Sequence, residues 1–110
     1  MFIKAAILLA ALTATANAAV VDFFNDNNCQ DFSYSRNIYD NTCGPTGGFQ
    51  SFRVTADGGN FQRLTAYSRN ACAGASTACI DAYGNYGCVS ATNVNGGSNA
   101  MSSGTGCGLV

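Results

Sequence analysis

Six cysteines are the sequence feature that most restricts how this chain can fold. They are Cys29, Cys43, Cys72, Cys79, Cys88 and Cys107 in a chain of 110 residues. An even number of cysteines in a short exported chain predicts disulfides formed in an oxidising compartment, here three of them. A domain of this size gains little stability from its core alone, and each disulfide adds about 2–4 kcal/mol. Zinc is the competing use of cysteines, but the chain has no histidine and no CxxC pair.

The first residues predict a cleaved signal peptide. Lys4 provides an early positive charge, the stretch from Ala5 to Leu12 is apolar, and Ala16-Asn17-Ala18 forms a small-x-small cleavage site. The apolar stretch is too short for a permanent membrane anchor, which needs roughly twenty residues. We therefore expect residues 1–18 to be a signal peptide and residues 19–110 to be one secreted, extracellular domain. The competing interpretation is a buried N-terminal helix.

The expected mature domain carries few charges. The chain has five Lys and Arg and six Asp and Glu, so loss of Lys4 leaves a net charge of 4 − 6 = −2. Nucleic acids and anionic lipids require clustered Lys and Arg, so neither is expected as a partner. Without histidine or a mature lysine, the usual proton shuttles at neutral pH are absent. The chain also has no Glu, and its Asp residues lie mostly in turns, so we expect no catalytic residues and no enzyme.

Short strands separated by turn clusters are predicted along the first part of the domain. Ala19–Phe24 is β-branched and aromatic, and it is followed by a polar turn at residues 25–28. Residues 43–48 form a second turn cluster, after which Phe49–Thr55 alternates apolar and polar side chains. A turn rich in Asp and Gly leads on to Phe61–Tyr67. The last two strands are therefore expected to pair as a hairpin.

The rest of the chain continues this all-β pattern. Cys79–Tyr83 and Tyr86–Ala91 flank Gly84-Asn85 and are expected to form a second hairpin. Residues 93–106 are rich in Gly, Ser and Asn and are expected to be irregular, with Cys107 fixing their end. No window after the signal peptide has helical periodicity. The pattern predicts an all-β sandwich or barrel of Greek-key type.

A weak internal repeat relates the two halves of the domain. Placing Cys29 on Cys72 gives each half a strand, an aromatic residue, a polar turn and a cysteine. The aligned pairs are Val21 with Leu64, Phe24 with Tyr67, Asn27 with Asn70 and Ser33 with Ser76. Two copies of one four-stranded motif are then expected to pack face to face and to bury Phe24, Phe52, Val54, Leu64 and Tyr67.

Six cysteines allow fifteen disulfide connectivities, and spacing does not choose among them. The repeat suggests one disulfide within each half, so our provisional pairing is Cys29–Cys43, Cys72–Cys88 and Cys79–Cys107.

One pattern in the sequence resembles the Greek-key signature of βγ-crystallin-like domains. It consists of an aromatic residue, a turn and Asn-x-Cys, followed at a distance by Phe49-Gln50-Ser51-Phe52-Arg53-Val54. Within that family the chain looks most like small cysteine-rich proteins secreted by filamentous fungi, some of which are killer toxins, antimicrobial proteins, effectors or elicitors. The resemblance implies a single disulfide-linked Greek-key β-sandwich. The chain lacks Trp, and Asp31 occupies the position where the family prefers glycine, as in Gly74 of the second half. A distorted turn is therefore expected in the first motif.

Crystallin-like motifs often bind calcium, so the resemblance implies that this chain could contain the family's calcium-binding pattern. Ser98-Asn99-Ala100-Met101-Ser102-Ser103 comes close to the family pattern, with Ser98 where Asn or Asp belongs, so the weak candidate ligands are Asn99, Ser102 and Ser103. The corresponding segment at residues 47–51 lacks such ligands. Calcium requires six to eight oxygens. We therefore expect no bound metal and no cofactor.

Four tyrosines are the candidate interaction surface: Tyr34, Tyr39, Tyr83 and Tyr86. Tyrosine combines a large contact area with a polar tip and is common at interfaces. The competing interpretation is that one tyrosine of each neighbouring pair, Tyr34 with Tyr39 and Tyr83 with Tyr86, lies in the core and that the other is an isolated surface residue.

Taken together, the sequence predicts a monomeric, secreted, non-enzymatic interaction protein. Its expected role is that of a fungal effector or elicitor that acts on a host or competitor through surface loops. Its partner is an unidentified extracellular protein or cell-surface target. The alternative is an antimicrobial or killer-toxin-like protein acting at a target cell wall or membrane, although such proteins usually carry a basic face.

Overall fold

The computed structural model describes residues 17–93 and 96–110, and within these ranges the chain forms strands and no helix. The strands are β1 (Ala18–Phe24), β2 (Phe32–Tyr39), β3 (Thr42–Phe49), β4 (Ser51–Ala56), β5 (Arg63–Arg69), β6 (Ala73–Asp81), β7 (Val89–Ser90) and β8 (Ser98–Gly104). The all-β prediction is confirmed. Residues 1–16 of the expected signal peptide lie outside the described residues. In the part of the chain that is described, no helix is long and apolar enough to cross a membrane.

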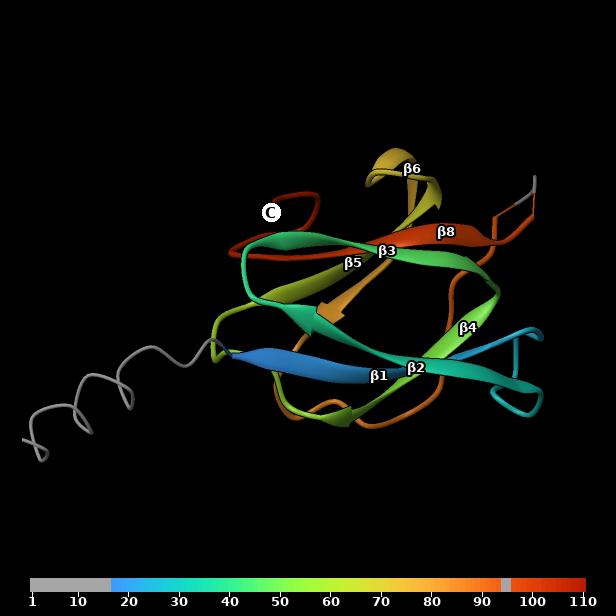
Figure 1. The fold of residues 1–110 in the computed structure, drawn as a ribbon, viewed down its shortest axis with the longest axis horizontal. Helices are drawn as coiled ribbons and strands as arrows, with labels where there is room; N and C mark the ends of the chain where they lie inside the picture. Colours follow the sequence, from blue (N-terminus) through green and yellow to red (C-terminus); the bar gives the residue numbers. More distant parts are fainter. Residues whose placement is uncertain (1–16, 94–95) are drawn as a thin grey trace, which may run out of the picture.

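The strands form two antiparallel sheets that pack as layers (Figure 1). One sheet has the order β2-β1-β4-β7 and the other the order β3-β8-β5-β6. Each sheet therefore holds three strands of one half of the chain and the third strand of the other half. Adding four to each strand number of the first sheet, and counting on from β8 to β1, gives β6-β5-β8-β3. This is the order of the second sheet read in the opposite direction. The internal repeat of the sequence is thus present in the strand order.

The core lies between the two sheets, as two packed layers require. The five side chains expected in the core, Phe24, Phe52, Val54, Leu64 and Tyr67, are all buried. Phe23 lies among other aromatic rings, with its centroid 5.1 Å from that of Tyr34 and 4.6 Å from that of Phe49. Such aromatic pairs contribute about 0.5–1.5 kcal/mol beyond the area that they bury.

Both predicted hairpins are wrong. β4 and β5 lie in different sheets, so residues 57–62 cross between the layers instead of reversing the chain within one sheet. The segment Cys79–Tyr83 begins in the last three residues of β6 and runs past its end, and Tyr86–Ala91 contains only the short β7 of the opposite sheet. Turn residues at these positions give a change of direction, but they do not determine whether the next strand joins the same sheet.

Two segments expected to be irregular are strands. Residues 43–48 form most of β3, and the Gly- and Ser-rich segment contains β8, which pairs with both β3 and β5. Small side chains suit these strands because the sheets approach closely there. A Cβ atom on Gly44 would lie 2.8 Å from Cδ1 of Ile38. Packing between the layers therefore overrides the low β-propensity of these residues.

The disulfides are Cys29–Cys88, Cys43–Cys72 and Cys79–Cys107. The provisional pairing was right for the third and wrong for the other two, because these two cross between the halves. Cys29 lies in the turn after β1 and bonds to Cys88, the residue before β7, which is the third strand of the second half. Cys72 lies in the turn after β5 and bonds to Cys43 in β3, the third strand of the first half. The expectation of one disulfide within each half is therefore wrong, and exchange of the third strands brings cysteines of opposite halves together.

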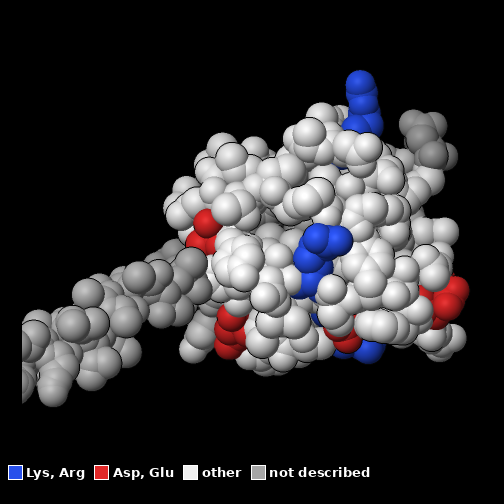
Figure 2. Space-filling model, viewed as in Figure 1, with Lys and Arg blue, Asp and Glu red and all other residues white. Residues whose placement is uncertain are grey.

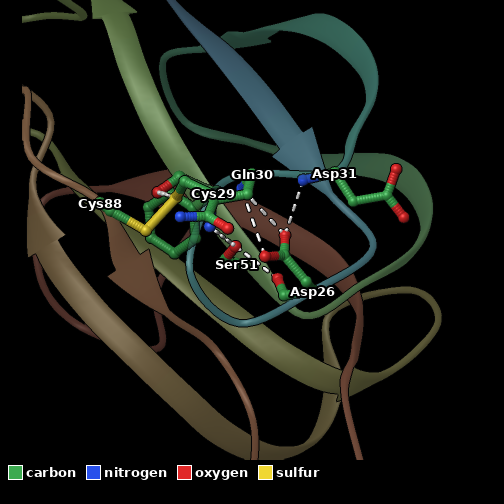
Figure 3. Close-up of a disulfide and its surroundings, with 7 residues drawn as sticks. Asp26, Cys29, Gln30, Asp31, Ser51 and Cys88 are labelled. Atoms are coloured by element: carbon green, nitrogen blue, oxygen red, sulfur yellow. Dashed lines mark hydrogen bonds between the residues drawn. A yellow bond between two sulfur atoms is a disulfide. The ribbon is translucent and has the colours of Figure 1, made fainter.

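The turn between β1 and β2 is held by the carboxylate of Asp26 (Figure 3). Its oxygens accept hydrogen bonds from the backbone N–H groups of Gln30 and Asp31, each at 3.0 Å. These bonds, that from Asp31 foremost, lower the pKa of Asp26. Cys29 and Cys72, which occupy equivalent positions in the two turns, both have a left-handed φ, of 56° and 54°. Gly74, the second residue of β6, has a left-handed φ of 79°, whereas its counterpart Asp31 does not lie in the left-handed region.

Ser51 connects this turn to β4. Its buried hydroxyl donates to the carbonyl oxygen of Asp26 at 2.6 Å and accepts from the backbone N–H of Cys29 at 3.0 Å. Cys29 has a φ of 56°, an unusual conformation for a non-glycine residue. The hydroxyl of Ser51 and the disulfide to Cys88 therefore fix the same turn from two sides.

Replacing Ser51 with alanine is expected to lower the free energy of unfolding by about 2 kcal/mol, because it leaves the buried N–H of Cys29 without a partner. Denaturant titration of the oxidised protein measures this change. Ser90→Ala is the matched control, since Ser90 pairs with Ser51 across the sheet but is exposed. Equal losses in the two variants would contradict the assigned role of Ser51.

Trypsin digestion without reduction tests the crossed disulfides. Cleavage after each arginine places Cys29 in the peptide ending at Arg36, Cys43 in residues 37–53 and the other four cysteines in residues 70–110. The observed connectivity predicts one species in which all three peptides are linked. Mass spectrometry that found the first two peptides linked only to each other would contradict it.

Candidate binding surface

Tyr34 is partly buried and packs against the core. Its ring stacks on Phe23, and its hydroxyl donates to the carbonyl oxygens of Thr46 and Gly47. The guanidinium of Arg36 lies 5.9 Å from the centre of the ring. Burial raises the pKa of the Tyr34 hydroxyl. Its position therefore agrees with the competing interpretation of this tyrosine as part of the packing.

The other three tyrosines are exposed, but they lie on different segments. Tyr83 and Tyr86 lie on the connection between β6 and β7, and about half of each side chain is exposed. Tyr39 is the last residue of β2 and is similarly exposed. Tyr83 and Tyr86 thus lie on one loop, and Tyr39 lies apart from them at the end of β2.

Phe61 is an aromatic surface residue that the sequence analysis missed. Its exposure of 83 % is greater than that of any other large hydrophobic side chain in the described ranges. The sequence placed it at the start of a strand, but β5 begins at Arg63. Phe61 has a φ of 75°, which is rare for a bulky residue. The only sequence signal was its place directly after a turn cluster.

Phe61 and Tyr83 line one open pocket of about 270 Å³ together with Asn60 and Asp81. The pocket thus combines two aromatic side chains with an amide and a carboxylate. A carboxylate oxygen of Asp81 lies 3.4 Å from Nε of Arg63, and both side chains are partly exposed. Nε of Arg63 makes no hydrogen bond within the described residues, so this contact is an ion pair without hydrogen-bond geometry.

Hydrogen bonds tie together the two connections that form the pocket. The carboxylate of Asp57 accepts the backbone N–H of Gly84 at 2.9 Å and the hydroxyl of Tyr86 at 2.7 Å. The backbone N–H of Gly58 donates to the carbonyl of Ala82 at 2.8 Å. Residues 57–62 therefore hold the segment with Tyr83 and Tyr86 in place. In Figure 1 both connections start at the end of the molecule where β1 begins.

The electrostatics of this contact follow from its hydrogen bonds. The backbone N–H of Gly84, and then the hydroxyl of Tyr86, lower the pKa of Asp57. In return, the hydrogen bond to Asp57 raises the pKa of Tyr86. Both residues thus favour the ionised carboxylate and the neutral phenol at neutral pH.

The weak calcium candidates Asn99, Ser102 and Ser103 each make hydrogen bonds within the fold. The amide nitrogen of Asn99 donates to the carbonyl of Ser68, the hydroxyl of Ser102 bonds to Tyr67 and Leu109, and the hydroxyl of Ser103 donates to Gln62. Ser102 and Ser103 are fully buried. Across residues 17–93 and 96–110, no group of three Asp, Glu, His or Cys residues is placed to hold a metal ion.

A second hollow lies at the other end of the strands. This pocket of about 340 Å³ is lined by Asn25, Gln50, Asn99 and neighbouring residues at the end of β3 and the start of β8. It has amide side chains but no exposed aromatic ring. Figure 2 shows one face of the molecule that is mostly uncharged, with few Arg and Asp side chains on it. The aromatic pocket is therefore the more distinctive candidate for binding.

Comparison with known proteins gives no match: no protein-family model, no curated protein and no solved structure is significantly similar to this chain.

The bond between Asp57 and Tyr86 predicts a pH-dependent loop contact. The folded protein lowers the pKa of Asp57 below 3.8, so the stabilisation is complete above pH 3.8 and is lost as the pH falls through the folded pKa. An NMR titration of the amide proton of Gly84 should report this midpoint. In Tyr86→Phe the midpoint should move up toward 3.8, because one hydrogen bond to the carboxylate is removed. An unchanged midpoint would contradict the contact.

Proposed function

We propose that this protein is a secreted, non-enzymatic interaction protein that binds its target through the aromatic surface of the β4–β5 and β6–β7 connections. The observation that carries this proposal is the exposure of Phe61, Tyr83 and Tyr86 on segments tied together by hydrogen bonds. Exposed aromatic side chains on fixed loops are typical of binding surfaces, because little conformational entropy is lost on binding.

The scaffold supports this role. Three disulfides join distant parts of a small domain, which suits an oxidising, extracellular environment. Two of them also anchor segments close to the aromatic surface: Cys79 lies in β6, two residues before Asp81, and Cys88 lies two residues after Tyr86. Loops on such a scaffold can vary in sequence without loss of the fold.

We further propose that the fold is a βγ-crystallin-like Greek-key sandwich. The exchange of the third strand between two four-stranded motifs supports this assignment. So does the buried Ser51 that bonds to the first turn, in the segment that carries the resemblance. By this resemblance, the favoured role is that of a fungal effector or elicitor acting on a host or competitor. Its target is an extracellular protein or cell surface.

The experiment applies purified, oxidised protein to plant leaf tissue and to fungal and bacterial cultures, beside a reduced and alkylated control. A response in leaf tissue that requires intact disulfides is expected for an effector or elicitor. Growth inhibition of microbes without a leaf response would replace it with the toxin-like alternative. No response in either system would contradict both roles.

Surface variants connect the response to the aromatic residues. Tyr83→Ser is expected to abolish the response without unfolding the protein, because the side chain is about half exposed. Phe32→Ser is the matched control, since Phe32 and Tyr83 are each 55 % exposed and Phe32 lies on β2 beside the turn held by Asp26. Loss of the response in the control alone would place the binding surface at the other end of the molecule.

A further inference from the structure

Phe61 combines two unfavourable features that its surroundings impose. Its side chain is almost fully exposed, and its backbone has a φ of 75°. The flanking residues fix this conformation, since the N–H of Gly59 donates to the carboxylate of Asp40 and the N–H of Gln62 donates to the carbonyl of Gly59. Strained residues that are held in place by their surroundings occur preferentially at ligand sites. Phe61 is therefore the starting point for identifying what the pocket binds.

The chemistry of the pocket indicates a ligand with one apolar face and a polar rim. Phe61 and Tyr83 present aromatic surfaces, and they come from two separate connections. The amide of Asn60 offers both donors and an acceptor, and the carboxylate of Asp81 offers acceptors. A pyranose ring has a matching arrangement, because its axial C–H groups form an apolar face and its hydroxyls project from the rim.

The size of the pocket limits the ligand to about one ring. Drug-sized ligands occupy pockets of roughly 300–1,000 Å³. The volume of about 270 Å³ lies just below that range. The pocket is also open to solvent, so a longer chain can continue beyond it on either side. One sugar unit of a polysaccharide fits these limits better than a large, rigid metabolite does.

Charge favours a neutral ligand over an ionic one. Asp81 is the only acidic or basic residue among the residues that line the pocket, and its carboxylate forms an ion pair with Arg63. The carboxylate of Asp81 would repel the negative charges of a sulfated or uronic-acid polymer. A cationic polymer would compete with Arg63 for the same carboxylate. Neutral hydroxyls can donate to the carboxylate oxygens while the ion pair remains.

We propose that this pocket binds one pyranose unit of a neutral polysaccharide. The sugar ring packs on Phe61 and Tyr83, and its hydroxyls hydrogen-bond to Asn60 and Asp81. This inference names the ligand class of the binding surface described above, and therefore rests on the proposed function. A protein target would use the same aromatic residues, and the experiment is designed to distinguish the two.

The test uses the purified, oxidised protein and three insoluble neutral polysaccharides: chitin, cellulose and β-1,3-glucan. The protein is expected to sediment with at least one of them, and the hexasaccharide of that polymer should shift the NMR signals of Asn60 and Tyr83. Phe61→Gly is expected to weaken this binding at least tenfold. Its unfolding midpoint should stay the same or rise, because glycine adopts a positive φ without strain. Phe32→Ser should bind as the unmodified protein does.

Each outcome separates the ligand class from the binding function. Failure to bind all three polymers would overturn the sugar inference. If Phe61→Gly still abolished the leaf or culture response in that case, the proposed function would stand with a protein target. Polysaccharide binding that Phe61→Gly left unchanged would place the sugar site elsewhere and overturn the assignment of this pocket.

Discussion

The exchange of the third strands between the two sheets is the constraint on which the rest of the structure depends. β3 pairs with β8 of the second half, and β7 pairs with β4 of the first half. Neither half can therefore complete its sheet alone, and the core forms only when the two halves meet. The crossed disulfides Cys29–Cys88 and Cys43–Cys72 join the same segments covalently. Cross-linking and strand pairing thus restrict the same long-range contacts, which the unfolded chain forms at high entropic cost.

The candidate binding surface follows from this arrangement. Because β4 and β5 belong to different sheets, residues 57–62 must cross from one layer to the other. The connection from β6 to β7 makes the opposite crossing, and the hydrogen bond from the N–H of Gly58 to the carbonyl of Ala82 places the two connections side by side. Hydrogen bonds from Gly84 and Tyr86 to Asp57 then fix their relative positions. An exposed phenylalanine and two tyrosines gain a defined geometry without any regular structure of their own.

In the proposed binding function, the scaffold and the candidate surface use different chemical groups. The scaffold uses buried hydroxyl and backbone groups, such as Ser51 with Cys29, to hold its turns. The surface uses aromatic rings, amides and a carboxylate paired with arginine. Such groups recognise shape and hydroxyl-rich or apolar surfaces more readily than ionic ones. A neutral glycan or an uncharged protein surface is the class of target that fits this chemistry.

The sequence by itself determined the local features of this protein. The cysteine count, the alternation around Phe52 and Val54, and the absence of helical periodicity gave three disulfides, an all-β fold and five core residues that are indeed buried. These depend on composition and on side chains close together in the chain. Only the tertiary structure decided which sheet each strand joins, which cysteines pair, and that Phe61 is exposed with a positive φ. Those outcomes depend on contacts between residues far apart in the chain, and a local pattern carries no information about which distant partner is selected.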